Sequence, residues 1–356
     1  MGAPEVSLTF IEKGITAIQR GERGVVLLLL KDTKSLGSHT VLSVSDIPDD
    51  LSELNQWYIQ KALLGYQVSP RRVLVYVMNS AAEDISTEYK TAETMMETTK
   101  FDWLAIPTIE TDEKTEEIAS WIKTQRTVNH RTVKAVLPNS PSDTEGVVNL
   151  TSSLFKNGTE YEPEQVTPRI AGLIAGTPMT IACTYAPLTD FDDCTRLAKA
   201  DLDDAVDDGE FVFEWDGEKV KVCRGVNSFV TTVDGKGESF KKIKIVEIMD
   251  MIQDDIVSTA RDSYIGKYAN SYDNKCLLIT AINAYFAELV RNGLLASGTC
   301  EINLERQKTY LGGKGIDTSD MSDEEIKQAN TGSYVFLKAT ISILDAMEDI
   351  EMEIYI

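Results

Sequence analysis

The sequence lacks most of the residues and motifs on which enzymatic and metal-binding chemistry depends. Only two histidines, His39 and His130, occur in 356 residues. Neither has a second histidine three or four positions away, which excludes a helical pair of metal ligands. No G-x-S-x-G sequence surrounds a serine, and no glycine-rich phosphate loop follows a predicted strand. We therefore expect no catalytic residue, no bound metal and no cofactor, and we interpret His130 as a solvated residue at a helix end.

Cysteine is also scarce. The number of cysteines is odd, their spacing is wide, and no C-x-x-C motif occurs, which argues against a disulfide framework and against zinc. We expect free thiols of a protein made in a reducing compartment. The five are Cys183, Cys194, Cys223, Cys276 and Cys300.

Long apolar runs are missing as well, and basic residues are fewer than acidic ones. The most apolar run, residues 25–30, is far too short to cross a bilayer, so we expect no membrane insertion. The 57 acidic residues outnumber the 35 basic ones, giving a formal net charge of -22. Such a chain repels nucleic acid, which we exclude as a partner. The N-terminal residues show no signal-peptide pattern, which predicts synthesis in a cytoplasm and leaves open a leader-independent route of release such as lysis.

The sequence does contain an alternating series of strand and helix patterns. Residues 25–30 suit a buried central strand, and residues 52–66 follow helical spacing. Alternation of this kind predicts βαβ units with a parallel sheet, and hence an α/β fold. The series continues with strands at 72–78, 103–107 and 132–137, helices at 85–99, 115–127 and 168–176, and a strand at 180–184.

The pattern changes after residue 190. The acidic stretch 190–209 marks a boundary or a solvated helix face, and Asp216-Gly217 predicts a hairpin. We interpret the glycine-rich residues 312–315 as a loop, and Gly172 and Gly176 as sites of close helix packing. The remaining expected elements are helices at 245–260 and 278–289, a short helix with a capping box of Ser322 and Glu325, and strands at 334–344 and 349–356.

Both ends of the sequence show the period-two alternation of a strand with one apolar face. Near the C-terminus the apolar residues are Ile350, Met352 and Ile354, and near the N-terminus they are Val6, Leu8 and Phe10. Terminal strands with unpaired edges favour strand addition to a neighbouring chain. We predict that these six residues carry an inter-subunit sheet. The alternative is that both strands pair within their own chain.

The order of these elements resembles that of contractile phage tail sheath proteins. It is most similar to the short sheaths of Gram-positive myophages and of R-type phage-tail-like bacteriocins. The similarity lies in the N-terminal segments 4–10 and 18–26, in Thr167-Pro168-Arg169-Ile170-Ala171-Gly172, in Gly225-Val226-Asn227-Ser228-Phe229, in the helix pair within 243–293 and in the final strand.

The resemblance implies a structural subunit rather than an enzyme. Sheath subunits stack as hexameric rings around an inner tube, share terminal strands, and contract to drive the tube through the target envelope. The implied partners are other copies of the chain, the inner tail tube protein, and the baseplate and tail terminator proteins.

The resemblance also implies a domain order, with an α/β domain inserted into an α+β core. The expected segments are an N-terminal arm 1–23, a first core part 24–68, an outer α/β domain 69–190, a C-terminal core 191–344 and an arm strand 345–356.

Two other functions remain open from the residues. An α/β enzyme or small-molecule-binding protein would need a concave site with convergent polar groups, which no motif marks. A shell or filament component could use the same strand exchange.

Overall fold

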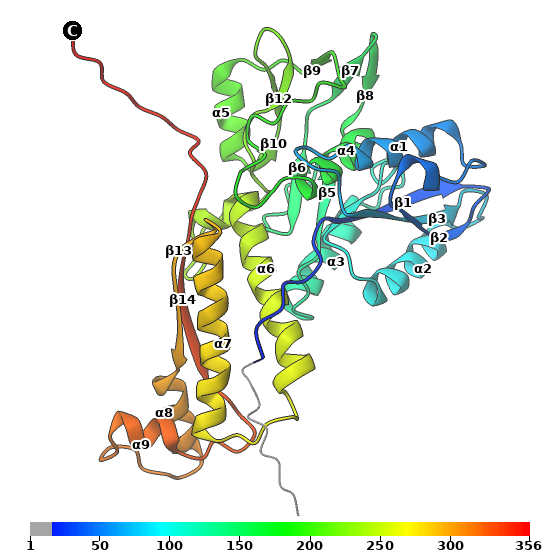
Figure 1. Cartoon of the computed structure of the whole chain (residues 1–356). Helices are drawn as coiled ribbons and strands as arrows, with labels where there is room; N and C mark the ends of the chain where they lie inside the picture. Colours follow the sequence, from blue (N-terminus) through cyan, green and yellow to red (C-terminus); the bar gives the residue numbers. More distant parts are fainter. Residues whose placement is uncertain (1–15) are drawn as a thin grey trace, which may run out of the picture. The chain divides into compact units, whose positions relative to one another are not determined.

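The computed structural model describes residues 16–356 and divides into two compact units (Figure 1). The α/β unit comprises residues 22–253 and 345–356, and the second unit comprises residues up to 21 and 254–344. The division falls inside helix α6 (Ile243–Thr259). Val6, Leu8 and Phe10 lie outside the described residues.

A seven-stranded sheet forms the centre of the α/β unit. The strand order is β10-β6-β5-β4-β1-β3-β2, and all neighbours pair in parallel except β2 and β3. The predicted parallel sheet is therefore confirmed. Its strands are β1 (Val25–Asp32), β2 (Gly37–Val41), β3 (Arg72–Asn79), β4 (Trp103–Ala105), β5 (Lys134–Pro138), β6 (Val147–Leu150) and β10 (Glu210–Phe211).

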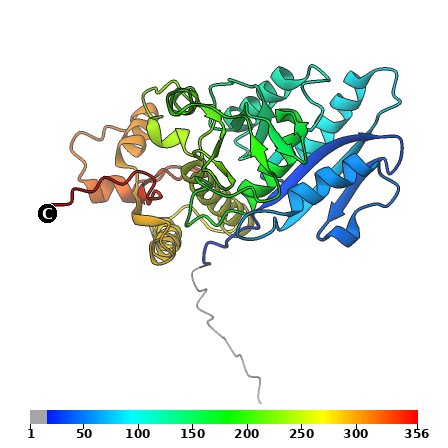
Figure 2. The ribbon, with the colours of Figure 1, turned by 90° about the horizontal axis from the view of Figure 1, so that it is seen from above.

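Helices cover both faces of this sheet. Helices α1 (Glu53–Leu63) and α4 (Pro163–Ala175) pack on one face, and α2 (Ile85–Thr98) and α3 (Thr115–Thr127) on the other (Figure 1). Successive residues of β1 point into the two cores in turn, which explains why its apolar run is continuous rather than alternating. In Figure 2, β1 is the long dark-blue strand beside α1.

Close packing of α1 on α4 depends on glycine. A Cβ atom on Gly172 would lie 2.0 Å from the carbonyl oxygen of Ala62, and one on Gly176 would lie 2.1 Å from that of Val68. The predicted role in close helix packing is confirmed for Gly172, whereas Gly176 caps α4 and lies against the loop that follows α1.

Helix α4 begins five residues earlier than the expected start at Pro168. Pro163 occupies the first turn, where a missing N–H costs nothing, and Glu162 and Gln165 form a capping box. Pro168 then lies inside the helix and cannot bond the carbonyl of Glu164. The hydroxyl of Thr167 donates to that carbonyl instead, at 2.7 Å.

The strand expected at 180–184 is absent, because a turn closed by Ile181 N–H and the carbonyl of Pro178 (3.0 Å) bends the chain there. The expected hairpin is present as β11 (Phe213–Trp215) and β12 (Val220–Val222). The acidic stretch contains α5 (Lys199–Asp207), which has no buried residue. Further small elements are β7 (Leu154–Lys156), β8 (Thr159–Tyr161), β9 (Asp193–Cys194), and short 3-10 turns at Val44–Asp46 and Glu238–Lys241.

The second unit combines helices with a two-stranded antiparallel sheet. After α6 and a π-helical turn (Ala260–Tyr264) come α7 (Tyr272–Arg291), β13 (Leu295–Ile302), α8 (Leu304–Gly313), α9 (Asp323–Gln328) and β14 (Leu337–Ile343). Helix α9 has the predicted capping box of Ser322 and Glu325. Gly312 and Gly313, expected in a loop, instead form the last turn of α8.

The compact units differ from the segments expected from the sequence. Strand β1, assigned to the first core part, lies in the same sheet as β3 to β6 of the expected outer domain. No boundary between compact units falls at residue 69 or 190. Which segments act as core and as outer domain in an assembly stays a prediction.

Candidate assembly surfaces

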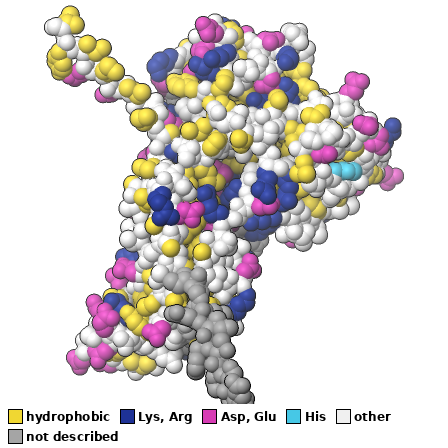
Figure 3. Space-filling view, in the orientation of Figure 1, with side chains coloured by type: hydrophobic (Ala, Val, Ile, Leu, Met, Phe, Trp, Pro, Cys, Tyr) yellow, Lys and Arg dark blue, Asp and Glu magenta, His cyan; other side chains and the backbone are white. Residues whose placement is uncertain are grey.

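The C-terminal segment (residues 345–356) forms no strand in the isolated chain. Ile350, Met352 and Ile354 are 78%, 75% and 77% exposed. Within residues 16–356, no backbone group pairs with this segment in a ladder. The structure thus gives the segment no strand partner among residues 16–356, and its pairing with a neighbouring chain stays a prediction. Figure 3 shows its hydrophobic side chains uncovered along an extended trace, which leaves an apolar row available to a partner.

The base of this segment, in contrast, is held by ion pairs and hydrogen bonds. Lys242 Nζ lies 3.2 Å from Glu348 Oε2 and also pairs with Asp345. The hydroxyl of Thr184 donates to Glu348 Oε1 at 2.5 Å. We call these residues, with the pair Arg224–Asp349, the arm-base cluster. It fixes where the segment leaves the α/β unit.

Ion pairing within the arm-base cluster stabilises the charged forms of Lys242 and Asp345. Partial burial opposes the charged ammonium of Lys242, but its hydrogen bonds to Asp345 and Glu348 raise its pKa above the usual value. Burial likewise opposes ionisation of Asp345, but the hydrogen bond from Lys242 lowers the pKa of that carboxyl. Lys242 and Asp345 are therefore both charged near neutral pH.

The residues that precede the α/β unit are attached to the end of α6. The backbone N–H of Gly21 donates to Asp255 Oδ1 at 2.7 Å, and Tyr285 Oη donates to Asp255 Oδ2 at the same distance. Tyr264 Oη donates to the carbonyl of Thr16 at 2.7 Å. This anchored stretch follows directly on the expected strand of Val6, Leu8 and Phe10, of which the structure gives no description.

The sheet of β13 and β14 offers strand edges in the second unit. Leu295, Cys300 and Ile302 of β13 are buried, whereas β14 has no fully buried residue. Among residues 16–356, β14 pairs only with β13. A sheet of two strands is marginal alone, and its unpaired edge is a template for another strand.

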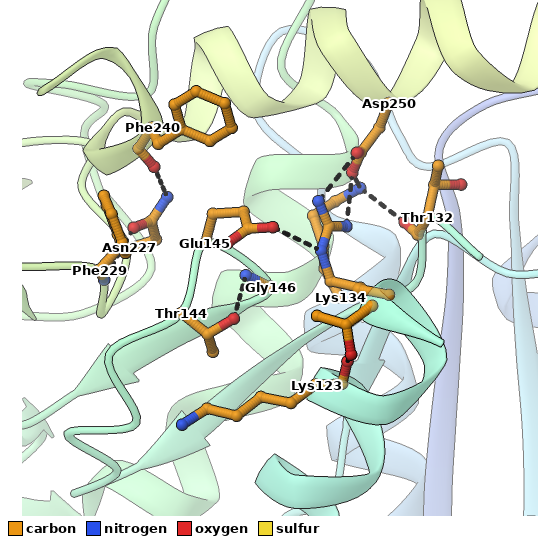
Figure 4. A network of polar contacts seen from close by, with 12 residues as sticks. Lys123, Thr132, Lys134, Thr144, Glu145, Gly146, Asn227, Phe229, Phe240 and Asp250 are labelled. Atoms are coloured by element: carbon orange, nitrogen blue, oxygen red, sulfur yellow. Dashed lines mark hydrogen bonds and ion pairs between the residues drawn. The ribbon is translucent and has the colours of Figure 1, made fainter. Parts of the chain in front are cut away.

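A network of buried charges joins α6 to the central sheet (Figure 4). Lys134 Nζ of β5 donates to Asp250 Oδ2 at 2.7 Å, and Arg126 of α3 donates to both oxygens of Asp250 at 2.9 and 3.0 Å. Arg126 Nε also lies 3.3 Å from Glu145 Oε1. Burial would raise the pKa of Asp250, but Lys134 and Arg126 hold it below its usual value. Each of these charged groups is paired with an opposite charge. The network therefore positions α6 and presents no free acid or base.

No chemistry emerges at the other candidate residues. His130 is exposed at a helix end with a φ of 52°, as expected, and His39 Nε2 lies 2.7 Å from the carbonyl oxygen of Ser35. All five cysteines are free, and burial raises the pKa of Cys183 to about 12, so its thiol is protonated and unreactive.

Within the described part of the chain, no group of three or more metal-ligating side chains converges. None of its helices has the length and apolar character to cross a membrane.

Comparison with known proteins decides the family. A family model for the phage tail sheath protein central domain matches residues 83–228, and one for the phage tail sheath C-terminal domain matches residues 235–356. A tail sheath protein of Clostridium phage phiCD119 is 37% identical over 361 residues, which cover 99% of each chain. The chain belongs to the phage tail sheath family.

Solved structures agree with this sheath assignment at the level of the fold. A sheath chain of the anti-feeding prophage in its contracted state superposes with a TM-score of 0.72 at 14% identity, covering 100% of this chain and 99% of that one. A chain of the six-fold symmetrised anti-feeding prophage baseplate gives 0.68 at 13% identity with the same coverage.

The predicted function is therefore confirmed at this level: the protein is a structural subunit of a contractile tail sheath and not an enzyme. The sheath functions within the assembled phage or particle.

Proposed function

We propose that this sheath protein polymerises as stacked hexameric rings around an inner tail tube and contracts to drive the tube through the target cell envelope. The six-fold symmetry of the similar baseplate structure supports the ring size, and the contracted sheath structure supports the transition. The partners are other copies of the chain, the inner tube protein, and the baseplate and tail terminator proteins. The subunit is made in the bacterial cytoplasm and leaves the cell by lysis.

The subunits are linked by strands that each chain gives to its neighbours. The observation that carries this proposal is the exposed apolar row of Ile350, Met352 and Ile354 beyond a fixed base. Val6, Leu8 and Phe10 have the same alternation and form the second linking strand. Main-chain hydrogen bonds of added strands persist while side-chain contacts elsewhere exchange, so the rings stay connected during contraction.

Electron microscopy of the purified full-length protein, with and without inner tube protein, tests this proposal. We expect hollow tubes or stacked rings from the full-length protein. A version lacking residues 345–356 and the variant Met352→Pro, which loses one ladder hydrogen bond, should give dispersed particles.

Met352→Leu is the matched control, because it keeps the backbone N–H and nearly the same volume. Tubes from Met352→Pro would contradict the role of the C-terminal strand. Dispersed particles from the full-length protein even with tube protein present would contradict polymerisation itself.

A further inference from the structure

The first residues that the structure describes run along the end of α6 (Figure 1). Residues 16–21, which we call the strap, are held there through their backbone groups. The contacts are Tyr264 Oη to the carbonyl of Thr16 at 2.7 Å, Gln19 N–H to Thr259 Oγ1 at 3.0 Å, and Gly21 N–H to Asp255 Oδ1 at 2.7 Å. We call the three side chains that make these contacts the clamp.

The π-helical turn after α6 brings the third clamp residue toward the other two. Asp255 and Thr259 are four positions apart and lie on one face of α6. In an uninterrupted α-helix, Tyr264 would lie about 180° around the axis from Asp255, because nine residues separate them at about 100° each. The bond from Ile265 N–H to the carbonyl of Ala260 (2.8 Å) spans five residues and widens this turn. The wider turn rotates Tyr264 back toward the strap.

The clamp is also held in place by contacts that do not involve the strap. Tyr285 Oη of α7 donates to Asp255 Oδ2 at 2.7 Å, and the ring of Tyr264 stacks on that of Tyr268 with centroids 5.4 Å apart. The clamp side chains therefore keep their positions when the strap leaves, and water can take the place of its backbone groups. Such a site is suited to release and rebinding.

The strap itself buries little apolar surface. Residues 16–21 belong to no helix or strand, and Ile18, which is 6% exposed, is their buried side chain. Segments with few buried apolar contacts open locally at a free energy well below that of global unfolding. The strap can therefore leave α6 while the rest of its unit stays folded.

Release of the strap changes the point from which the preceding chain moves. While the strap is bound, the chain before Thr16 starts from a fixed point on α6. After release the fixed point is Glu22, where the α/β unit begins. Six residues span at most about 20 Å at about 3.3–3.6 Å each. Thr16 can then lie anywhere within about 20 Å of Glu22.

We propose that the strap is a length reserve: the clamp holds it in the free subunit and in the extended sheath, and gives it up in the contracted sheath. Contraction moves subunits relative to one another, so a neighbour that binds the residues before Thr16 needs the longer reach. This inference rests on the proposed sharing of the N-terminal strand. It adds a releasable segment behind that strand and assigns control of its release to the clamp residues.

Amide hydrogen exchange at Gln19 and Gly21 tests the release. Full-length polymers assembled with inner tube protein are compared before and after contraction by urea, which is removed before exchange, and electron microscopy identifies each state. We expect both amides to exchange as slowly in the extended polymer as in the free protein, and about tenfold faster in the contracted polymer. Equal protection in the two polymers, or fast exchange already in the extended one, would overturn the proposal.

The free protein supplies a second test that requires no polymer. Its Gln19 and Gly21 amides should exchange more slowly than those of an unstructured peptide, but about a hundredfold faster than that of the buried Leu289 in α7. Exchange as slow as at Leu289 would show that the strap opens only when its unit unfolds, and would overturn the proposal. Absence of polymers in electron microscopy would instead count against the proposed function.

The variant Tyr264→Phe tests the clamp, because it removes the hydroxyl that binds Thr16 and keeps the ring that stacks on Tyr268. Exchange at Gln19 and Gly21 in the free protein should become about 2- to 12-fold faster, which corresponds to the loss of one hydrogen bond. Tyr334→Phe, which removes an exposed hydroxyl from the same unit, should leave both rates unchanged. Unchanged rates in a folded Tyr264→Phe protein would show that the clamp does not hold the strap.

Discussion

Replacing Lys242 by methionine tests whether the arm-base cluster holds the start of the C-terminal segment. Methionine keeps an unbranched apolar side chain but cannot pair with Glu348 or Asp345. An exposed ion pair contributes about 0.2–1 kcal/mol, and a buried carboxylate that loses a partner costs about 1–3 kcal/mol. The side chain of Glu348 is only 7% exposed but keeps its hydrogen bond from Thr184. We therefore expect the attachment of the C-terminal segment to weaken by about 1–2 kcal/mol. Detachment of the segment should then rise about 5- to 30-fold.

A glutamate-specific protease measures this detachment, because the segment contains its own reference sites. Glu348 is held in the cluster, whereas Glu351 and Glu353 are exposed. When the segment reattaches faster than it is cut, cleavage follows the detached fraction. The ratio of cleavage at Glu348 to cleavage at Glu351 should rise by the predicted factor in Lys242→Met. For the wild type it should rise at about 1 M salt, where the screening length is about 3 Å.

Lys241→Met is the control for this experiment, since Lys241 Nζ pairs with Glu238 at 2.9 Å and not with the segment. An unchanged ratio in Lys242→Met, or an equal rise in Lys241→Met, would refute the idea that the cluster fixes the segment.

Two further substitutions probe the α/β unit. Gly172→Ala should lower the free energy of unfolding by about 1–3 kcal/mol, because the new Cβ atom meets the carbonyl of Ala62. Gly312→Ala is the control and should not lower it, because no atom lies near the new Cβ. Thermal unfolding compares the two variants. Asp250→Asn should cost about 3–5 kcal/mol in denaturant unfolding, since Lys134 and Arg126 lose their shared carboxylate. The folded pKa of Asp250 lies below the unfolded value of 3.8, so its contribution is present above pH 3.8 and is lost as the pH falls through the folded pKa. The stability difference between wild type and Asp250→Asn should therefore shrink in acid, and a constant difference would argue against a role for the charge.

The central sheet could be predicted because its signals are local. A six-residue apolar run such as 25–30 suits a strand buried on both faces, and β1 is that strand. The start of α4 was predicted at Pro168 but lies at Pro163, for a physical reason that the sequence pattern does not show. The hydroxyl of Thr167 replaces the hydrogen bond that Pro168 cannot donate, so the helix tolerates an internal proline.

The contacts that position the candidate surfaces could not be read from the sequence. Lys134 and Asp250 are separated by 116 residues, and a lysine within a strand usually indicates a solvated edge. The backbone N–H of Cys300 donates to Asn283 Oδ1 of α7 at 2.6 Å, and nothing in the local sequence of either residue marks this contact. The C-terminal alternation predicted a strand, but residues 345–356 form none in the structure, so the strand and its partner both stay predictions.

The isolated C-terminal segment remains unpaired for an energetic reason that also bears on assembly. Burying Ile350, Met352, Ile354 and Ile356 would gain about 6–12 kcal/mol at about 1.5–3 kcal/mol each. Fixing seven backbone residues costs about 7–14 kcal/mol at about 1–2 kcal/mol each. The two nearly cancel, so strand addition alone cannot overcome the repulsion between subunits that each carry a formal charge of -22. Contacts between the folded parts of neighbouring subunits must supply the remaining free energy of assembly. The arm-base cluster reduces the entropy cost of strand addition by fixing residues 345–349 in advance. The strand is thus suited to connect subunits whose other contacts drive the assembly.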